Sequence, residues 1–286
     1  MGEPLPICHL NGEFLPLRDA RISPLDRGFL YSDGAYEVTP VYGGRPFRFD
    51  EHHARLTRSL TGIRMADPLT RDEWRGLYRE LIARNGAASS DAYIYVQVTR
   101  GAEYGRNHAP LPDVPRTVFA FAAPWPTGRA GWRENGLPAV TAQDTRWARC
   151  DIKSVNLLPN AMAKQLAVDA NAWEAVFVRD GTVTEGTSSN CFAVIAGQLR
   201  THPATRAILG GVTRDVTIAA ARTLGIEVVE RAFTVSELES ADEAFLTSTT
   251  NDVMPIVRID GRAVGSGVPG ALTKRLSDAV QATLYR

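Results

Sequence analysis

The feature that most constrains the fold is a break near the middle of the chain. The segment Pro124-Trp125-Pro126-Thr127-Gly128 places two prolines and a glycine close together. Neither a helix nor a central strand is expected to continue through it, because proline lacks a backbone donor and glycine is costly to order. The sequence therefore predicts an N-terminal domain over residues 1–123, an interdomain linker over 124–133 and a C-terminal domain over 134–286.

The first half combines strand and helix patterns. The pair Gly43-Gly44 is typical of a hairpin turn, and Asp50 is suited to cap a helix. Thr70 and Glu73 form a capping-box pattern, in which a hydroxyl and a carboxylate each satisfy an amide at a helix end. The expected elements are a hairpin over 35–49, helices over 51–63 and about 71–84, and strands over 92–99 and 117–123.

The second half shows the same mixture. Asp180-Gly181 separates two strand-like runs, which is a strong hairpin signal. The other expected elements are strands near 139–147, 190–195, 199–201, 227–233 and 244–247, and helices over 160–170, about 212–224 and 271–284. Mixed elements in both halves predict an α/β protein with two α+β lobes, and a cleft between lobes is a common ligand site.

Composition excludes several classes of protein. The chain has 32 basic and 32 acidic residues, so its formal net charge is zero, and 44% of its residues are hydrophobic. Nucleic-acid and membrane surfaces usually require a basic excess or a long apolar run, so neither partner is expected. Three widely spaced cysteines and the absence of a signal-peptide pattern favour a soluble, cytoplasmic protein without a disulfide framework or a metal site.

Three features of the second half carry chemistry. Only three of the 32 basic residues are lysines, and Lys153 lies in a segment that is apolar on one side, where a partly desolvated amine can act as a nucleophile. Residues 183–190 form a dense polar segment containing one carboxylate, Glu185. Gly210-Gly211 leads into a helix whose first amides can bind a phosphate.

Each of these features alone has an ordinary explanation: a solvated lysine, a solvated turn, and glycines needed only for close packing. Together, a reactive amine, a carboxylate and a phosphate cradle describe a pyridoxal phosphate site. The aldehyde of that cofactor needs a lysine, its pyridine nitrogen needs an anion, and its phosphate needs amides and a cation.

Several ordered motifs then resemble the class IV (fold type IV) aminotransferases, which use pyridoxal phosphate. The motifs are "RGFLYSDGAYEV", "FDEHHARL", "CDIKSVNLLPNAMAKQ", "GTVTEGTSSN", "ILGGVTRD" and "LTSTTNDVMPI". The resemblance covers about residues 10–280. It implies a two-domain fold with the cofactor in the cleft between a smaller N-terminal and a larger C-terminal domain, and it implies a homodimer.

The resemblance also implies residue roles. Lys153 would carry the cofactor covalently and move the proton between substrate and cofactor. Glu185 would pair with the pyridine nitrogen, and Leu209 would pack on the ring. The remaining cofactor-binding residues implied by the motifs, which surround the phosphate, are Arg55, Val212, Thr213, Ser248 and Thr249. His52 and His53, beside Arg55, are expected to be structural or solvated.

The first half discriminates between members of the family. The pair Arg106 and His108 can aim both side chains in one direction, and arginine recognises carboxylates bidentately. With Tyr36, this pair resembles the carboxylate trap of D-amino-acid aminotransferases, which act on donors such as D-alanine or D-glutamate and on acceptors such as 2-oxoglutarate or pyruvate. The loop before Arg106 is one residue longer than that pattern.

The alternatives left open are a branched-chain L-amino-acid aminotransferase, an (R)-selective amine transaminase, an aminodeoxychorismate lyase and a non-enzymatic protein that only carries the cofactor. The segment 265–270 matches G-x-G-x-x-G, but too little chain follows it to complete a dinucleotide-binding unit. We expect this segment to be a turn before the last helix.

Overall fold

The computed structural model describes residues 3–125 and 128–285. The chain forms two compact units: unit 1 comprises residues 1–127 and 152–156, and unit 2 comprises residues 128–151 and 157–286. The α/β class expected from the sequence is confirmed, because both units combine helices with a sheet. The domain boundaries at 124–133 stay a prediction. Residues 126 and 127 of that linker lie outside the described residues, and helix α4 begins at Arg129.

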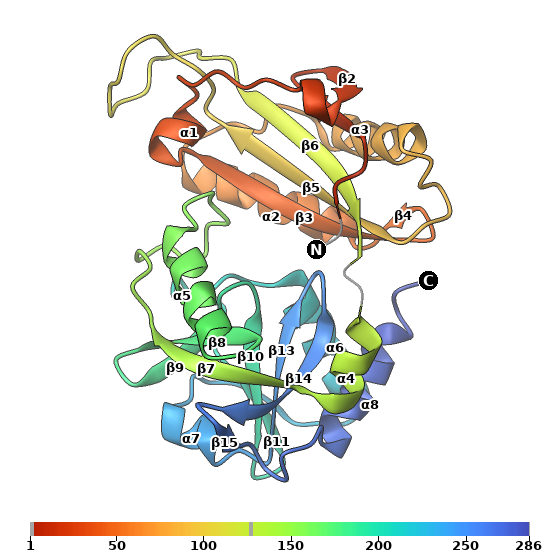
Figure 1. Ribbon diagram of the computed structural model, residues 1–286, viewed down its shortest axis with the longest axis vertical. Coiled ribbons are helices and arrows are strands. Elements are labelled where there is room, and N and C mark those ends of the chain that lie inside the picture. The colour runs from red at the N-terminus through yellow and green to blue at the C-terminus, as the bar shows by residue number, and fades with distance from the viewer. Residues whose placement is uncertain (1–2, 126–127, 286) are drawn as a thin grey trace. The chain divides into compact units, whose positions relative to one another are not determined.

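Within residues 3–125, unit 1 forms a six-stranded antiparallel sheet (Figure 1). In spatial order its strands are β2 (Glu13–Pro16), β1 (Ile7–Leu10), β6 (Thr117–Pro124), β5 (Ala92–Thr99), β3 (Gly34–Tyr42) and β4 (Arg45–Pro46). Its helices are η1 (Leu17–Asp19), α1 (Arg27–Tyr31), α2 (Phe49–Gly62) and α3 (Arg71–Arg84). The expected hairpin is confirmed as β3 and β4 joined at Gly43-Gly44.

Alternation along the strands places one face of this sheet in a core. On β5, Ile94, Val96 and Val98 are fully buried and pack with residues of α2 and α3, which cover that face (Figure 1). Leu60 of α2 and Trp74 of α3 are among the largest fully buried side chains. Each such side chain contributes roughly 1.5–3 kcal/mol through burial. The capping box of Thr70 and Glu73 is confirmed at the start of α3.

The start of α2 differs from the prediction. Asp50 is not its N-cap; the helix begins at Phe49, after Arg48, which has a left-handed backbone and makes no side-chain cap. Phe49 is buried in the core, and this packing makes the helix begin two residues earlier than the predicted start at residue 51. The Asp50 carboxylate instead accepts hydrogen bonds from Arg71 and Arg75 of α3.

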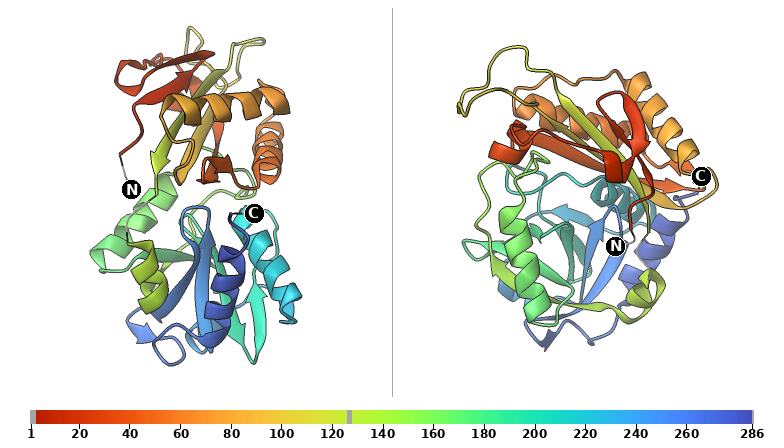
Figure 2. Two further views of the ribbon diagram at one scale, coloured as in Figure 1. Left: turned by 90° about the vertical axis from the view of Figure 1, so that its right-hand side faces the viewer. Right: turned by 45° about the horizontal axis from the view of Figure 1, so that its top comes forward.

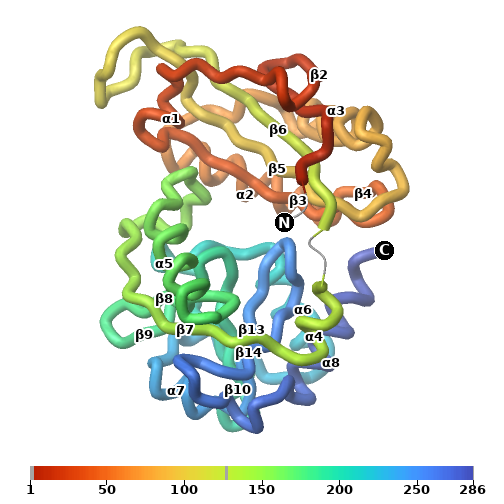
Figure 3. The backbone as a smooth tube through the Cα atoms, viewed as in Figure 1, coloured from red at the N-terminus to blue at the C-terminus, as the bar shows by residue number. Residues whose placement is uncertain are grey.

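Residues 100–116 form a long loop between β5 and β6 that extends beyond the end of the sheet (Figure 3). Gly101, at its start, has φ +96°, and a Cβ there would lie 1.9 Å from the carbonyl oxygen of Pro115. Only glycine therefore fits where the two ends of the loop meet.

Unit 2 forms a nine-stranded mixed sheet within residues 128–151 and 157–285. In spatial order its strands are β12 (Val228–Glu230), β11 (Gln198–Thr201), β10 (Asn190–Ile195), β13 (Glu243–Ser248), β14 (Asp252–Ile259), β7 (Leu137–Gln143), β8 (Glu174–Arg179) and β9 (Thr182–Gly186), with β15 (Arg262–Ala263) beside β14. Pairing of Glu185 with Asn190 also joins β9 to β10. This pairing closes β10, β13, β14, β7, β8 and β9 into a ring.

Helices pack on the outside of these strands. Within its described residues, the helices of unit 2 are α4 (Arg129–Asn135), α5 (Leu158–Asp169), α6 (Val212–Thr223), α7 (Val235–Glu239) and α8 (Ala271–Gln281). Helix α5 places Ala163 and Ala167 against β7 and β8. Helices α6 and α8 lie side by side against β13 and β14 (Figure 2).

Most expected elements of unit 2 are confirmed, including the hairpin at Asp180-Gly181. The strand expected over 227–233 is shorter, and β14 was not expected. Pro255 interrupts the β14 sequence and has no N–H to donate. The strand forms nevertheless because Pro255 lies opposite Phe245 of β13, while its pairing with β7 begins only at Ile256.

Candidate active site

Lys153 lies in unit 1, although the sequence on both sides of residues 152–156 belongs to unit 2. Its backbone is fixed on two sides. The Lys153 carbonyl accepts from the Tyr36 amide at 3.0 Å, and the Lys153 amide donates to the Ser59 hydroxyl at 3.0 Å. Ser154 also bridges Ala35 of β3. The amine of Lys153 therefore projects from a segment anchored to a strand and a helix.

The Lys153 side chain lies against Tyr36. Its Nζ is 4.1 Å from the centre of the Tyr36 ring, and the side chain is partly buried. Tyr36 in turn stacks on Tyr95 with 5.5 Å between ring centres. Within the described part of unit 1, no carboxylate forms an ion pair with Lys153. Within unit 1, the Lys153 amine contacts the face of the Tyr36 ring.

Arg55 is buried on α2 and pairs with Glu37 of β3. Arg55 Nε and Nη2 donate to the two Glu37 carboxylate oxygens at 2.8 and 2.6 Å, and His52 Nδ1 lies 3.0 Å from Oε1. Burial alone would raise the pKa of Glu37, but the charge and hydrogen bonds of Arg55 and the hydrogen bond of His52 hold this pKa well below its ordinary value. Burial lowers the pKa of His52, so His52 is a neutral structural residue.

Arg106 and His108 lie on the exposed part of the 100–116 loop. Both contact the ring of Tyr31: the Arg106 guanidinium is 5.3 Å from its centre, and the His108 ring centre is 5.7 Å away. The structure thus brings Arg106 and His108 together on one aromatic ring. That ring is Tyr31, whereas the ring contacts of Tyr36 are with Tyr95 and Lys153.

Glu185 is buried in unit 2, where β9 meets β10. Its carboxylate accepts from the Leu209 amide at 3.1 Å on each oxygen, from Asn190 Nδ2 at 3.1 Å and from Arg146 Nη1 at 2.5 Å. The Asn190 amide also donates to the Leu209 carbonyl at 2.8 Å. Glu185 and Leu209, predicted separately, are therefore held together by Asn190.

Sequence reasoning did not single out Arg146, although it lies in the run "RWARCDIKS". Burial alone would lower the pKa of Arg146, but hydrogen bonds to Asp144 and the charge of Glu185 raise it above its ordinary value. Arg146 thus stays cationic between two buried carboxylates and also lies 4.4 Å from the centre of the Phe177 ring. No local pattern could have identified this role, because Arg146 and Glu185 are 39 residues apart.

The first turn of α6 contains Val212 and Thr213. Its N-cap, Gly211, provides no side-chain hydrogen bond, so the opening amides of α6 are not capped by that residue. A Cβ at position 211 would lie 2.1 Å from Asn190 Oδ1. Glycine at this position therefore lets the helix start pack directly against the Asn190 side chain that contacts Glu185.

The polar segment after Glu185 is not a solvated turn. The hydroxyls of Thr187, Ser188 and Ser189 all donate to Glu174, which is fully buried, at 2.5, 3.4 and 3.2 Å. The hydroxyl groups are thus organised by a second carboxylate that sequence reasoning missed. Its signal was weak because Glu174 opens a strand that otherwise reads as apolar.

Ser248 is the last residue of β13 and Thr249 follows it; both are partly buried. Ser248 pairs with Asp252 of β14, and its hydroxyl lies 3.1 Å from Asn251 Nδ2. Thr247, just before them, pairs with Asn190 across β10 and β13. The motif "TSTT" therefore begins at the end of β13, the strand beside the one that begins at Asn190, and continues past it.

Other candidate chemistry is limited. Among the described residues, no group of three or more His, Cys, Asp or Glu could hold a metal ion, and Cys8, Cys150 and Cys191 are free and buried. No helix in the described part of the chain is long and apolar enough to cross a membrane. In the first turn of α8, the amides of Leu272 and Thr273 donate to Glu243, so these amides after segment 265–270 are already occupied.

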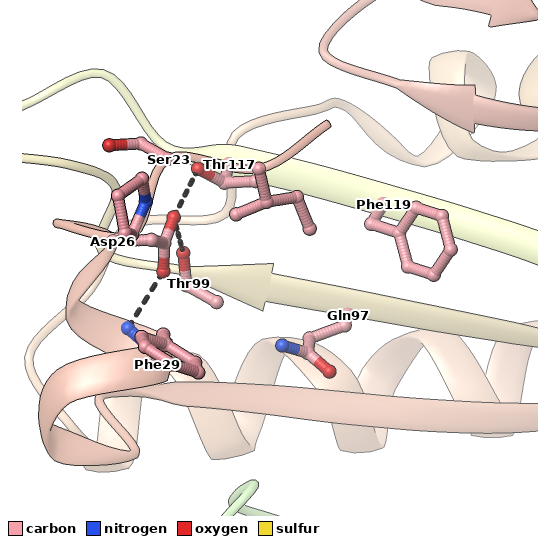
Figure 4. Close-up of a pocket in the computed structure, with 10 residues that line it drawn as sticks. Ser23, Asp26, Phe29, Gln97, Thr99, Thr117 and Phe119 are labelled. Carbon is pink, nitrogen blue, oxygen red and sulfur yellow. Dashed lines mark hydrogen bonds between the residues drawn. The ribbon is translucent and has the colours of Figure 1, made fainter. Parts of the chain in front are cut away.

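Unit 1 also contains a pocket of about 430 Å³ beside α1 (Figure 4). It is lined by apolar rings, including Phe29 and Phe119, around the buried Asp26 carboxylate. Asp26 accepts from the hydroxyls of Thr99 and Thr117 at 2.9 and 2.6 Å. None of the described residues that line this pocket was predicted as a site residue.

Comparison with known proteins gives a consistent family. A sequence model described as amino-transferase class IV matches residues 34–259. The chain is 41% identical to the D-alanine aminotransferase of Bacillus licheniformis, over 95% of this chain and 94% of that protein. It is 42% identical to the D-alanine aminotransferase of Staphylococcus haemolyticus, over 94% of each chain.

Solved structures with the same fold include branched-chain amino acid aminotransferases. The enzyme from Escherichia coli matches with a TM-score of 0.89 and 28% identity, covering 97% of this chain and 94% of its own. The T.th. enzyme with pyridoxamine 5′-phosphate matches with a TM-score of 0.88 and 31% identity, covering 97% of this chain and 93% of its own. The chain therefore belongs to the class IV aminotransferases, the fold type IV enzymes that use pyridoxal 5′-phosphate.

Proposed function

We propose that this aminotransferase acts on D-amino acids, transferring an amino group from a donor such as D-alanine or D-glutamate to a 2-oxo acid such as 2-oxoglutarate or pyruvate. The observation that carries this proposal is the 41% identity to a D-alanine aminotransferase over nearly the whole chain. The two branched-chain enzymes of the same fold compared above are 28% and 31% identical. The Arg106 and His108 pair supports an amino acid over an amine as the donor, because arginine binds a carboxylate.

The residues provide the chemical groups that pyridoxal phosphate needs: an amine, a carboxylate and anion-binding amides. Lys153 supplies an amine whose backbone is fixed, and Glu185 supplies a buried carboxylate. The first amides of α6 supply donors suited to an anion. When bound, the cofactor supplies a ring that accepts the electrons left at the substrate Cα. Lys153 Nζ would hold the cofactor and then carry the Cα proton, and Glu185 would face the pyridine nitrogen.

We assign the remaining roles by the same reasoning. Leu209 packs on the ring. The residues that hold the phosphate are Arg55 as a cation, Val212 and Thr213 as amides, and Ser248 and Thr249 as hydroxyls. Tyr36, Arg106 and His108 bind the carboxylate of the substrate. This anchor fixes which Cα substituent faces Lys153, so only one enantiomer presents its Cα–H to the amine.

The visible spectrum of the purified protein tests the proposal. The cofactor band should change on addition of D-alanine, and should not change with L-leucine or (R)-1-phenylethylamine. A change with L-leucine only would make the enzyme a branched-chain aminotransferase, and a change with the amine only would make it an amine transaminase. Pyruvate release from aminodeoxychorismate would indicate the lyase, and a band that responds to no donor would indicate a cofactor carrier.

Two variants test the assigned roles. Lys153→Ala should lose transamination, and retention of full activity would remove Lys153 from its role. Glu185→Gln keeps the shape of the side chain, so it should still bind the cofactor but react at least about tenfold more slowly, because the neutral amide stabilises a protonated pyridine less well. An unchanged rate would contradict the role of Glu185.

We also propose that the enzyme is a homodimer. Helix α5 supports this, because Leu158, Met162 and Leu166 lie four residues apart and are 69%, 63% and 56% exposed. Such a stripe on one helix face is typical of an interface. Sedimentation equilibrium should give twice the chain mass, and Met162→Glu should shift the protein toward the monomer. A wild-type protein that stays monomeric would contradict the proposal.

A cytoplasmic location is part of the same proposal. It rests on three free, buried cysteines, which suit a reducing compartment. Fractionation of cells that express the tagged protein should place it in the cytoplasmic fraction. Recovery in a membrane or secreted fraction would contradict it.

A further inference from the structure

Arg27 is a buried arginine that none of the predicted roles uses. Its side chain is 3% exposed and makes four hydrogen bonds. Nε donates to Asp33 at 2.9 Å and Nη1 to Glu103 at 2.6 Å. Nη1 and Nη2 also donate to the backbone carbonyls of Asn107 and His108, at 2.7 and 2.9 Å. One guanidinium thus holds the backbone of residues 107 and 108.

The position of Arg27 is itself fixed by the sheet. Asp26, the residue before it, caps α1 by accepting from the Gly28 amide at 2.7 Å. The same carboxylate accepts from Thr99 of β5 and Thr117 of β6 (Figure 4). These two threonines lie at the ends of β5 and β6 that the 100–116 loop joins, so α1 and the base of the loop share one anchor.

Glu103 provides the second half of the attachment. It is a buried residue in an otherwise exposed part of the loop, and its other oxygen accepts from the Leu111 amide at 2.9 Å. That hydrogen bond, together with Arg27, holds the pKa of Glu103 below its usual value. Tyr104, directly after it, is 94% exposed. The longer loop is thus accommodated with Glu103 pointing inward and Tyr104 outward.

Tyr31, one turn after Arg27 on α1, contacts the same segment. Its ring centre lies 4.6 Å from the Arg27 guanidinium, 5.3 Å from that of Arg106 and 5.7 Å from the His108 ring. Arg27 therefore fixes the backbone of residues 107 and 108, and the aromatic ring beside it contacts the side chains of Arg106 and His108.

From this arrangement we propose that Arg27, together with Glu103, is a positioning residue for the amino-acid substrate. It holds Arg106 and His108 in the orientation that receives the substrate carboxylate. The inference rests on the proposed role of Arg106 and His108. A flexible loop would have to lose conformational freedom each time a substrate binds, and Arg27 removes that cost in advance.

Two variants weaken the hydrogen bonds that attach the 100–116 loop to Arg27 without replacing either side chain by a small one. Arg27→Lys keeps the charge but replaces a planar fork by a single ammonium group, which cannot reach both carboxylates and both carbonyls at once. Glu103→Gln keeps the volume of the side chain but leaves it one oxygen instead of two. That oxygen can accept from Arg27 or from the Leu111 backbone amide, but not from both as the carboxylate does. Glu103→Gln also serves if Arg27→Lys does not fold. Arg84→Lys, at an exposed arginine of α3 paired with Glu80, is the matched control.

We would measure KM and kcat for D-alanine, the affinity for pyridoxal phosphate, and hydrogen–deuterium exchange of residues 103–111. Arg27→Lys and Glu103→Gln should raise the KM for D-alanine about tenfold, the loss expected for one charged hydrogen bond. They should change kcat and cofactor affinity less than about twofold and should speed exchange in the loop. Arg84→Lys should match the wild type in every readout.

Arg106→Ala, measured in parallel, separates the two proposals. If Arg106→Ala raises the KM and the Arg27 and Glu103 variants do not, the positioning role is wrong while the carboxylate role stands. If Arg106→Ala leaves the KM unchanged, the carboxylate role is wrong, and the positioning role falls with it. A parallel loss of cofactor affinity in both attachment variants would show a general structural defect and would also overturn the inference.

Discussion

Glu37 offers the sharpest test of how unit 1 is stabilised. Its side chain is fully buried and accepts from Arg55, from His52 and from the Val38 amide, which lies 2.9 Å from Oε1. In Glu37→Gln the amide has one oxygen and one NH₂ group, so the NH₂ must face at least one of these donors. The buried Arg55 guanidinium also loses the negative charge of Glu37.

The expected cost is large. Removing one partner of a buried ion pair typically destabilises a protein by about 3–5 kcal/mol. Unit 1 contains roughly 130 residues, and an unfolding entropy of about 2.1 cal/mol/K per residue converts that loss to about 10–18 °C in Tm. Differential scanning calorimetry and urea unfolding at pH 7 measure both quantities. Glu80→Gln, at an exposed position of α3, is the control and should cost below about 1 kcal/mol.

The pH dependence has a definite sign. The folded pKa of Glu37 lies below its ordinary value of 4.5, so its contribution to stability is complete above pH 4.5 and is lost as the pH falls below that value. The difference in stability between wild type and Glu37→Gln should therefore narrow as the pH drops below 4.5. A double variant that replaces Glu37 by Met and Arg55 by Leu should be more stable than Glu37→Gln, because it buries no charge.

A loss in the free energy of unfolding below about 1 kcal/mol in Glu37→Gln would refute this reasoning, because removing the carboxylate of a buried ion pair typically costs several times more. A double variant less stable than Glu37→Gln would refute it as well, since the remaining charge would then not be the cause.

Three further predictions follow from local geometry. Thr70→Ala removes the capping box of α3 and should lower the stability of unit 1 by about 1 kcal/mol in urea unfolding, whereas Thr70→Ser should keep it. Leu60→Ala creates a cavity at a fully buried position and should cost about 2–5 kcal/mol; a smaller loss would mean that the core closes around it. Gly211→Ala places a Cβ 2.1 Å from Asn190 Oδ1, so it should weaken pyridoxal phosphate binding at least about tenfold by equilibrium dialysis. Gly131→Ala, at a position of α4 where a Cβ would meet no atom within 4 Å, should leave binding unchanged.

The sequence predicted local features well and tertiary ones poorly. The capping box of α3 involves residues three apart, so it can be recognised without knowing the fold. The start of α2 could not be recognised, because it depends on the burial of Phe49 against other elements. Strand β14 was missed for a similar reason, since Pro255 reads as a break and is tolerated only through its place opposite β13.

The site residues divide in the same way. Lys153, Glu185 and the glycines before α6 could be predicted as candidates from the sequence because each lies in a motif with its own chemistry. Arg27 and Arg146 were not, because their importance lies in what they contact. Arg27 donates to Glu103, 76 residues away, and Arg146 donates to Glu185, 39 residues away. Contacts across such separations leave no periodic or local pattern in a single sequence.

The placement of Lys153 depends on unit 1, although its neighbours in sequence belong to unit 2. Cys150, three residues before it, is bonded through its amide to Arg206 in unit 2, whereas Lys153 and Val155 are bonded to β3 and α2 in unit 1. The direction of the amine is therefore set by the Tyr36 amide and the Ser59 hydroxyl.

Ser59→Ala should remove the hydrogen bond from the Lys153 amide to the Ser59 hydroxyl and leave this amide, in a largely buried segment, without its acceptor. We expect a lower kcat with little change in the KM for D-alanine, because Lys153 would move the proton while Arg106 and His108 would bind the carboxylate. A change in KM alone would contradict that division of roles.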